Sequence, residues 1–420
     1  MMTQEQNELM TRVGPGARMG ALLRRYWHPV AALDEMKDKW THRVRILGED
    51  LVLYRDRSGK FGLIEESCPH RRASFFHGIP TENGIRCMYH GWEFDGSGAC
   101  TQQPFEKGRN ALLGKKIADA YPVEELGGML FAYLGPLPAP LLPRYAEYTW
   151  TNAVRTIGKF VIPCNWLQCM ENSADPVHTE WLHGHLHQFR HEKEGVSTAI
   201  ARAHDRIAFD EFEFGLIKRR LYVGQSETSE DWTVGHPIVF PNTLLVGSGG
   251  GMWKAHTFQI RVPVDDTHTA HYWYSAYVPP EGKTAPEHLR GRAPYYEPKL
   301  RTPDGEWNLE MIDAQDIMAW VTQGPIADRT RENLAASDTG VVAFRRMLTR
   351  ELEKIERGED PIGVLRDPAR NRNIELPMEK GKSMYSDGFA SYLERMAVRH
   401  SPIRDDLVDL FTPRAKEAAE

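Results

Sequence analysis

The sequence predicts an α+β protein, with a small all-β domain followed by a larger domain of antiparallel sheet and helices. Short apolar runs at 44–47, 51–55 and 61–64 are separated by turn-forming residues, which is typical of strands joined by hairpins. Residues 198–280 contain long runs in which apolar and polar side chains alternate, as in a sheet with one buried face. Helical patterns return at 306–357, so the larger domain combines sheet and helices.

The chain is expected to divide into three segments. Residues 1–40 are predicted to form a helical segment that packs on the larger domain, with a Gly-Pro-Gly break before apolar residues at helical spacing. The all-β domain is expected at 41–145, where it ends in a proline-rich connector. The larger domain takes 146–420, and its tail after about 380 is charged and partly irregular.

The composition is that of a globular protein. The 420 residues are 41% hydrophobic and 26% charged, and the formal net charge of −6 does not favour nucleic acid as a partner. The N-terminus has no signal-peptide pattern, and glycines and prolines interrupt the most apolar stretch, so no membrane span is predicted. Three cysteines remain outside the motif described next, an odd number that suits a reducing compartment, and we expect a cytoplasmic protein.

Four side chains between residues 68 and 90 form the most informative motif. Cys68 and His70 lie in C-P-H, and Cys87 and His90 lie in C-M-Y-H. In a Rieske [2Fe-2S] centre two thiolates hold one iron and two imidazoles hold the other, so each of two loops supplies one Cys and one His. A structural zinc site also uses two Cys and two His, but it usually pairs Cys with Cys and His with His. The spacing therefore favours a Rieske cluster.

A second group of candidate metal ligands lies in a D-x2-H-x4-H pattern at Asp175, His178 and His183. Two imidazoles and a carboxylate can form a facial triad that leaves positions on iron(II) open. His178 and His183 are about 140° apart around a straight helix, so the helix must distort or end there, and Gly184 is consistent with an end. Spacing alone leaves other histidines open, because they share the i,i+4 separation of metal pairs or lie close by: His185, His187 and His191.

A further carboxylate ligand has to come from elsewhere in the chain. Residues 309–323 have the pattern of a buried helix that ends at Gly324 and Pro325. This helix contains Asp313 and Asp316, and a buried carboxylate is costly unless it is paired or binds a metal. Both acids face apolar neighbours, so periodicity does not choose between them.

Together these motifs resemble the Rieske non-heme iron ring-hydroxylating oxygenases, in particular the oxygenase (alpha) component of the phthalate-dioxygenase-like and aromatic O-demethylase branch. The resemblance implies a Rieske domain at 41–145 and a mononuclear iron catalytic domain of helix-grip fold at 146–420. It also implies that four residues hold one [2Fe-2S] cluster: Cys68, His70, Cys87 and His90.

The same resemblance implies one mononuclear Fe(II), held by His178, His183 and Asp316. The choice of Asp316 rests on a Q-D-x7-G-x-I-x-D-R frame that begins at Gln315 and looks like the phthalate-dioxygenase branch. Asp313 remains the alternative carboxylate.

In this family the working unit is a trimer, so we expect a homotrimer or a hexamer of stacked trimers. The resemblance implies that Asp175 is not a ligand but an electron-transfer bridge, which links His178 of one subunit to a cluster histidine of its neighbour. A helix cap before Pro176 is the alternative role of Asp175. Asn172 is expected to face the iron pocket.

Electrons are expected to come from another protein, because the glycine run at 247–252 does not fit a nucleotide-binding motif. By resemblance, a flavin- and iron–sulfur-containing reductase or a ferredoxin delivers them, so NAD(P)H acts only indirectly. Seven basic residues form either a docking face for this partner or a scattered solvated surface: Arg71, Arg72, Arg86, Lys107, Arg109, Lys115 and Lys116.

The resemblance implies an enzyme that uses O2 to monooxygenate or O-demethylate an aromatic substrate that bears a carboxylate. The segments G-H-P-I-V-F-P-N and R-V-P-V-D-D-T-H-T look like demethylase-type members. Ring cis-dihydroxylation of the phthalate type is the alternative, and a non-catalytic Rieske electron carrier is a remote one. Lys254, His256 and Arg261 are candidates to hold the carboxylate or a phenolate.

Overall fold

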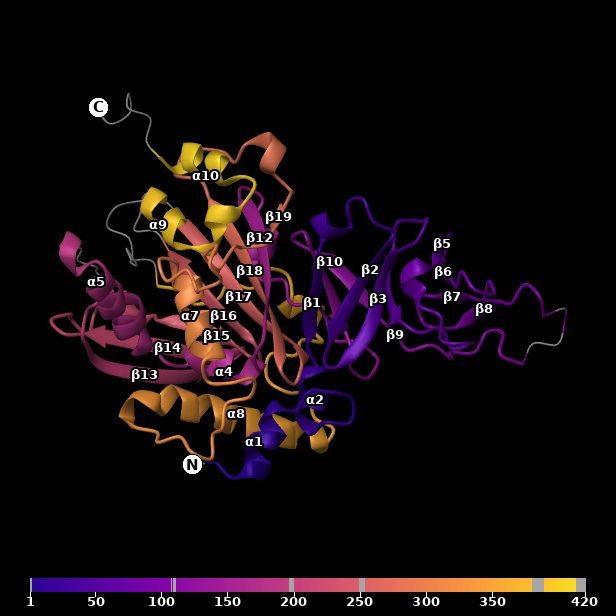
Figure 1. The fold of residues 1–420 in the computed structure, drawn as a ribbon, viewed down its shortest axis with the longest axis horizontal. Coiled ribbons are helices and arrows are strands. Elements are labelled where there is room, and N and C mark those ends of the chain that lie inside the picture. The colour runs from indigo at the N-terminus through magenta and orange to yellow at the C-terminus, as the bar shows by residue number, and fades with distance from the viewer. Residues whose placement is uncertain are drawn as a thin grey trace.

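The computed structural model describes residues 2–106, 108, 111–195, 200–248, 254–379 and 389–412. A narrow β-rich part lies on one side of the molecule, and a larger part of sheet and helices lies on the other (Figure 1). The predicted α+β class is confirmed. Among the described helices, the structure shows no segment long and apolar enough to cross a membrane.

Two short helices begin the chain, α1 (Gln4–Thr11) and α2 (Arg18–Leu23). The second is the helix predicted after the Gly-Pro-Gly break, and it buries Met19, Leu22 and Leu23. Helix α1 packs on α4 and helix α2 packs on α8, so both contact the larger part. The strand β1 (Trp27–Ala32) follows and pairs with β11 of the β-rich part.

Three small antiparallel sheets build the β-rich part, in the orders β1-β11-β10, β2-β3-β4-β9 and β5-β6-β7-β8. The hairpin-linked strands predicted between 44 and 64 are present as β2, β3 and β4. The strands are β2 (Thr41–Ile46), β3 (Glu49–Arg55), β4 (Phe61–Glu65), β5 (Ile79–Thr81), β6 (Gly84–Arg86), β7 (Glu93–Asp95), β8 (Cys100–Gln102), β9 (Ala120–Tyr121), β10 (Val123–Leu126) and β11 (Met129–Tyr133).

An eight-stranded sheet forms the centre of the larger part, in the order β13-β14-β15-β16-β17-β18-β12-β19. All its pairings are antiparallel except the short one between β12 and β19. The strands are β12 (Val154–Ile162), β13 (His204–Phe212), β14 (Gly215–Tyr222), β15 (His236–Val239), β16 (Thr243–Ser248), β17 (Lys254–Asp265), β18 (His268–Val278) and β19 (Tyr295–Tyr296).

The two central strands are buried on both faces, so the prediction of one buried face is wrong for them. Residues 255–263 of β17 and 269–277 of β18 are buried without interruption. Helix α4 packs on β17, and β2 of the β-rich part packs on β17 as well, so neither face is left to solvent. The edge strand β13 keeps the alternating, half-exposed character.

The helices of the larger part surround this sheet: α4 packs on β16, β17 and α7, and α8 packs on α2, α4 and β13 (Figure 1). Helix α7 is buried over most of its length, as the sequence predicts. The helices are α3 (Ala146–Thr149), α4 (Trp166–Ser173), α5 (Leu186–Arg190), α6 (Glu230–Thr233), α7 (Ile312–Val321), α8 (Thr339–Glu356), α9 (Phe389–Arg395) and α10 (Arg404–Phe411).

Candidate active site

Two loops at the tip of the β-rich part bring the first motif together. The amide of Arg72 donates to the carbonyl of Cys68 at 2.8 Å, and the amide of Gly91 donates to the carbonyl of Cys87 at 3.0 Å. Both Arg72 and Gly91 adopt a positive φ, at 61° and 74°. Each loop therefore makes the same turn at the same distance from its cysteine, and the two loops are related as a Rieske cluster requires.

Inside these loops the thiols are buried and the imidazoles face outward. Cys68 and Cys87 are 1% and 2% exposed. The rings of His70 and His90 lie 4.5 Å apart between centroids, and His70 stacks on Trp92 at 4.3 Å. The donor set, with one Cys and one His from each loop, fits a [2Fe-2S] cluster held near the surface.

Three of the basic residues around these loops contact other side chains. Arg72 forms an ion pair with Glu65, and Arg86 forms one with Glu93. Arg71 lies over the ring of Tyr89. Lys107 and Arg109 lie outside the described residues, and the docking face stays a prediction. Most of the glycine run, 249–252, is also outside them.

The second motif begins where α4 ends. The carboxylate of Asp175 accepts hydrogen bonds from the amides of Val177 at 2.8 Å and His178 at 3.3 Å, so Asp175 caps the turn after α4. Residues Thr179–His185 then form a π-helix, which runs on into α5. The predicted distortion is present, since a π-helix changes the angle between His178 and His183 and is often found at functional sites.

The predicted helix end at Gly184 is wrong. The chain stays helical through Gly184 and up to Arg190. A Cβ atom at Gly184 would lie 2.5 Å from the Cα of Ala201, so glycine is required there by the close approach of another segment and not by a turn.

Three candidate ligands come together from the turn after α4, the π-helix and α7. The Nε2 atom of His183 lies 3.2 Å from Oδ1 of Asp316, and the Nε2 atom of His178 lies 3.6 Å from the same oxygen. The potential ligand atoms of the three residues lie within 4.8 Å of one another. Asp316 comes from α7, more than a hundred residues away in the chain, so the fold assembles the set.

Hydrogen bonds fix the tautomer of both imidazoles. The Nδ1 atom of His178 donates to the carbonyl of Asp175 at 2.5 Å, and Nδ1 of His183 donates to the side-chain oxygen of Gln315 at 2.8 Å. With Nδ1 used in this way, Nε2 is the ring nitrogen of each histidine that faces Asp316. Such backing of a histidine by a second group is the usual arrangement behind a metal ligand.

The charges of the three residues also suit a metal. Burial lowers the pKa of His178 to about 3, so this imidazole is neutral. Burial opposes ionisation of Asp316, but His183, whose own pKa is raised by Asp316 against the effect of burial, and Arg261 hold the pKa of Asp316 at about 2. His183 and Asp316 are 5% and 8% exposed, and the His178 side chain is 16% exposed, so two imidazoles and a carboxylate that fit a mononuclear iron(II) are largely shielded from solvent.

Asp313, the alternative ligand, forms hydrogen bonds with residues outside the candidate iron site. Its two oxygens accept hydrogen bonds from Nε1 of Trp273 at 2.7 Å and from the amide of Ala397 at 2.6 Å. Burial raises its pKa to about 6. The convergence of His178 and His183 on Asp316 therefore favours Asp316 over Asp313 as the candidate ligand.

A cavity of about 280 Å³ opens onto the three residues. Asn172 lines it, as predicted, and donates a hydrogen bond to Oδ1 of Asp316 at 3.3 Å. Part of the lining is apolar, from Ile200, Leu244, Val246, Ile312 and Met396. An opposing set of polar side chains comes largely from β14 and its neighbours: Lys218, Arg220, Tyr222 and His236.

Arg220 is the most unusual residue of this lining. It is 5% exposed, and its nearest partners among the described residues are Oη of Tyr222 and Nε2 of His236, each at 3.3 Å. Its buried Nε atom has no hydrogen-bond partner in the described part of the chain. A buried cation without an ion pair is costly, so this guanidinium suits an anionic group of a bound molecule.

The three residues proposed from sequence to hold a carboxylate do not line the cavity, so that prediction is wrong. Lys254 lies over the ring of Trp150, and His256 contacts Glu147 at 2.8 Å. Arg261 donates to Ser173 at 2.6 Å inside the core. Side chains alternate along a strand, so position 261 cannot share a face with 254 and 256.

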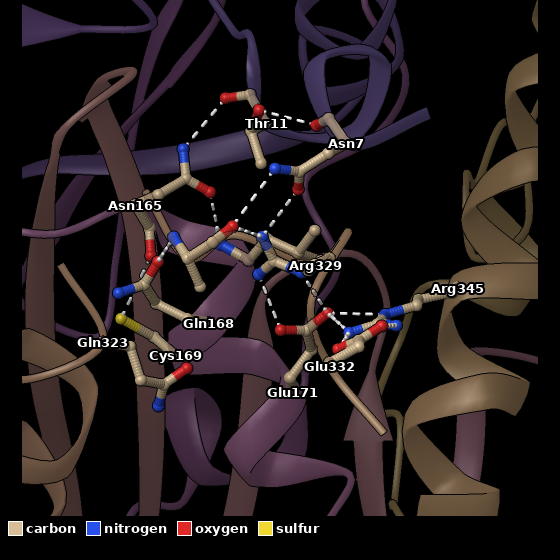
Figure 2. A network of polar contacts seen from close by, with 12 residues as sticks. Asn7, Thr11, Asn165, Gln168, Cys169, Glu171, Gln323, Arg329, Glu332 and Arg345 are labelled. Carbon is tan, nitrogen blue, oxygen red and sulfur yellow. Dashed lines mark hydrogen bonds and ion pairs between the residues drawn. The ribbon is translucent and has the colours of Figure 1, made fainter. Parts of the chain in front are cut away.

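Figure 2 shows a buried network that holds α4 in place. The carboxylate of Glu171 accepts two hydrogen bonds from Arg329, at 2.6 and 2.8 Å, and one from Arg345 at 2.6 Å. Arg329 also donates to the side chain of Asn7 on α1 at 3.0 Å. Burial opposes ionisation of Glu171, but the two arginines keep its pKa below its usual range.

Gln168 completes the attachment of α4. Its side chain donates to the carbonyls of Trp320 and Gly324 and accepts from the amide of Ala327 (Figure 2). The segment after α7 therefore binds α4 through two sets of hydrogen bonds, one made by Gln168 of α4 and one made by Arg329. This explains in physical terms why an Arg stands thirteen residues after Asp316 in the sequence frame.

Two family models match the chain. The model described as Rieske [2Fe-2S] domain matches residues 26–121, and the model described as LigXa C-terminal domain like matches residues 295–375. The first includes β1 and both cysteine loops, so the Rieske interpretation of the first motif is supported over structural zinc. The second includes α7.

Curated relatives cover most of the chain. The oxygenase subunit of 5,5'-dehydrodivanillate O-demethylase from a Sphingobium species is 44% identical over 383 residues, 90% of this chain and 87% of that protein. The oxygenase subunit of phthalate 4,5-dioxygenase from Pseudomonas putida is 32% identical over 401 residues, 87% of this chain and 89% of that protein.

Solved structures share the fold at lower identity. NdmA from Pseudomonas putida CBB5 matches with a TM-score of 0.61 and 18% identity over 81% of this chain and 94% of that one. Dicamba monooxygenase bound to dicamba matches with a TM-score of 0.54 and 19% identity over 80% of this chain and 99% of that one.

Proposed function

Because the chain belongs to the oxygenase subunits of multicomponent Rieske non-heme iron oxygenases, we propose that it monooxygenates, by O-demethylation, an aromatic substrate that bears a carboxylate. Its electrons come from NAD(P)H through a separate reductase or ferredoxin. Cys68, His70, Cys87 and His90 hold one [2Fe-2S] cluster in this proposal, and His178, His183 and Asp316 hold one mononuclear iron per chain.

The side chains of the proposed iron site have distinct tasks. When bound, the iron supplies open coordination positions at which dioxygen is activated. Gln315 and the carbonyl of Asp175 keep the two imidazoles in the tautomer that presents Nε2. Asn172 stands beside Asp316 at the cavity wall and holds the carboxylate in one orientation.

The observation that carries the substrate class is the buried guanidinium of Arg220 in the cavity wall, which forms no ion pair with any residue that the structure describes. A carboxylate placed against Arg220 and Lys218 would turn the rest of an aromatic ring toward the apolar residues of the cavity and toward Asp316. Relatives named for dehydrodivanillate, phthalate, phenoxybenzoate and 3-chlorobenzoate agree with an aromatic acid.

Demethylation is favoured over ring dihydroxylation by one observation. The relative at 44% identity is an O-demethylase subunit, whereas the phthalate dioxygenase subunit is 32% identical. Both reactions use the same metal sites, so the group that lies over Asp316, His178 and His183 decides between them. Phthalate-type cis-dihydroxylation is the second candidate.

We also propose that the chain works as a homotrimer. The segments that carry His70 and His90 lie between β4 and β7 in the β-rich part, and His178 lies between α4 and α5 in the larger part, with α5 at the edge opposite β5–β8 (Figure 1). Met88 and Tyr89 are 48% and 53% exposed beside His90, and Trp181 and Phe189 are 62% and 74% exposed near the iron site. Contact between these surfaces in neighbouring copies would cover both, with Asp175 as the electron-transfer bridge.

The test is to incubate the protein, its reductase and NADH with paired aromatic acids, each with and without a methoxy group. Formaldehyde and a phenol are expected from the methoxylated acid, in equal amounts with NADH consumed. The matched control is His178→Ala, which should form neither product. A cis-diol without formaldehyde would show dihydroxylation and not demethylation. If neutral methoxylated compounds react as well as the acids, the substrate does not need a carboxylate.

A further inference from the structure

A second group of metal-binding side chains lies outside the proposed iron site. His187 on α5, His191 just after it and Glu310 before α7 bring their potential ligand atoms within 4.8 Å of one another. The rings of His187 and His191 lie 4.5 Å apart between centroids. They are four residues apart on one helix face, the separation at which two imidazoles reach one ion.

The two carboxylate oxygens of Glu310 contact different partners. Its Oε1 atom accepts from Arg190 at 3.0 Å, and its Oε2 atom contacts Nε2 of His191 at 2.7 Å. Arg190 therefore fixes the side chain while Oε2 stays turned toward the two imidazoles. The distance from Oε2 to Nε2 is that of a hydrogen bond, and it would open to about 3.3 Å if both atoms bound one tetrahedral ion.

His191 has the second contact that a metal-bound histidine usually has. Its Nδ1 atom lies 3.0 Å from Oε2 of Glu194, on the far side of the ring from Glu310. With Nδ1 donating to Glu194, Nε2 is the atom left for an ion. A carboxylate behind the imidazole is the common arrangement in zinc sites and raises the basicity of the ligand.

One ring nitrogen of His187 has no hydrogen-bond partner among the described residues. His187 is 9% exposed, and this nitrogen is its buried Nδ1 atom. A buried imidazole nitrogen that lacks a partner costs free energy, which an ion bound by this ring would offset.

We propose that His187, His191 and Glu310 form a second metal site, separate from the iron site, for a divalent transition metal such as zinc. Two histidines and one glutamate are a common zinc ligand set, which leaves a fourth position for water. Arg190 and Arg395 place positive charge nearby, and Glu310 and Glu194 place negative charge against the imidazoles. Protons compete with the ion for His191, since its contacts with Glu194 and Glu310 raise the pKa of the ring.

The site joins two segments that matter for the iron ligands. His187 follows His183 by four residues on the same continuous helix, and Glu310 precedes Asp316 by six residues at the start of α7. An ion between them would tie the π-helix and α5 to the beginning of α7. Binding to the folded state alone also raises the unfolding temperature.

The test is equilibrium dialysis of the iron-loaded oligomer against zinc chloride, followed by elemental analysis. The expected result is one zinc per chain that is absent from His187→Ala and from His191→Ala. Glu194→Gln, which touches only the group behind His191, should weaken zinc binding by about tenfold or more. In thermal unfolding, zinc should raise the midpoint of the wild type but not of His187→Ala.

Two controls separate this site from its neighbours. His185→Ala, which changes a half-buried histidine on the same helix, should bind zinc like the wild type. The double variant His178→Ala with His183→Ala should keep the zinc, because its loss there would mean that zinc had entered the iron site. The proposal is overturned if His187→Ala and Glu194→Gln bind zinc like the wild type. It is also overturned if the folded wild type binds no zinc.

Discussion

Asp313 and Asp316 lie three residues apart on one buried helix, and their neighbours give them different chemistry. Asp313 accepts from Trp273 on β18 and from the amide of Ala397, whereas Asp316 faces two imidazoles. Neither partner of Asp313 is near it in the sequence. Helical periodicity places both acids in the core but cannot say which tertiary partner each acid meets, so only the sequence frame around Gln315 favoured Asp316.

Replacing Asp316 by Ala is predicted to remove the mononuclear iron and the oxygenase activity and to leave the visible spectrum of the cluster unchanged. Asp313→Asn should keep the iron and instead lose stability, by about 1–3 kcal/mol, because a buried hydrogen-bond acceptor is lost. Iron and acid-labile sulfide analysis checks both variants. Iron lost from Asp313→Asn and retained by Asp316→Ala would move the ligand to Asp313.

Arg220→Met is predicted to raise the KM for an aromatic acid by about tenfold or more, since a charge-assisted hydrogen bond contributes about 1.5–3 kcal/mol. The KM for the corresponding amide should change much less, because the amide carries no charge. Arg219 is the matched control: it lies on the other face of β14 and pairs with Asp210. A KM that rises equally for acid and amide would assign Arg220 a structural role only.

At the level of elements, the irregular helix after α4 is the feature that sequence predicted in part. The separation of His178 and His183 showed that a straight α-helix could not present both. The structure instead has a π-helix that continues into α5 and in which Gly184 lies under the close approach of Ala201, which no local pattern reveals. The histidines beyond His183 therefore stay on the same helix and meet Glu310.

The network around Glu171 is predicted to be a main support of α4 (Figure 2). Glu171→Gln leaves Arg329, which is 1% exposed, without its counter-charge, and the expected loss in the free energy of unfolding is about 3 kcal/mol. Urea unfolding followed by tryptophan fluorescence measures it. Arg12→Ala, in the exposed pair with Asp266, is the control and should cost less than about 1 kcal/mol. Equal losses in both variants would contradict this account of α4.

The joint between β1 and the large sheet is predicted to weaken in acid. His28 is buried between the carbonyl of Leu23 and the side chain of Asn242, and burial lowers its pKa to about 4. The unfolded chain takes up a proton below pH 6.5 and the folded one does not, so this stability is present above pH 6.5 and is lost as the pH falls toward 4. Between pH 7 and 5 the loss is about 2 kcal/mol.

His28→Gln, which cannot be protonated, tests this directly. The free energy of unfolding of the wild type minus that of the variant should fall by about 2 kcal/mol from pH 7 to pH 5. If the difference is the same at both pH values, His28 does not carry the pH dependence.

For the whole molecule, the order of the domains and the two metal motifs could be predicted, because each depends on short-range spacing. The substrate pocket could not. Lys218, Arg220 and His236 lie on neighbouring strands that pair in a register set by the entire sheet, and nothing in their local sequence distinguishes them from Lys254 and His256, which face Trp150 and Glu147. The oligomer is also a property of the whole molecule, because the proposed cluster ligands lie in the β-rich part and the proposed iron ligands lie in the larger part.

The central claim is that the two metal sites work together across a subunit boundary, with Asp175 between them. The most direct measurement mixes two inactive variants by co-expression: Cys68→Ser with Cys87→Ser, and His178→Ala with His183→Ala. Mixed trimers are predicted to regain part of the demethylase activity, because some interfaces pair an intact cluster site with an intact iron site. Mixed trimers that contain both metals and stay as inactive as each variant alone would contradict the claim.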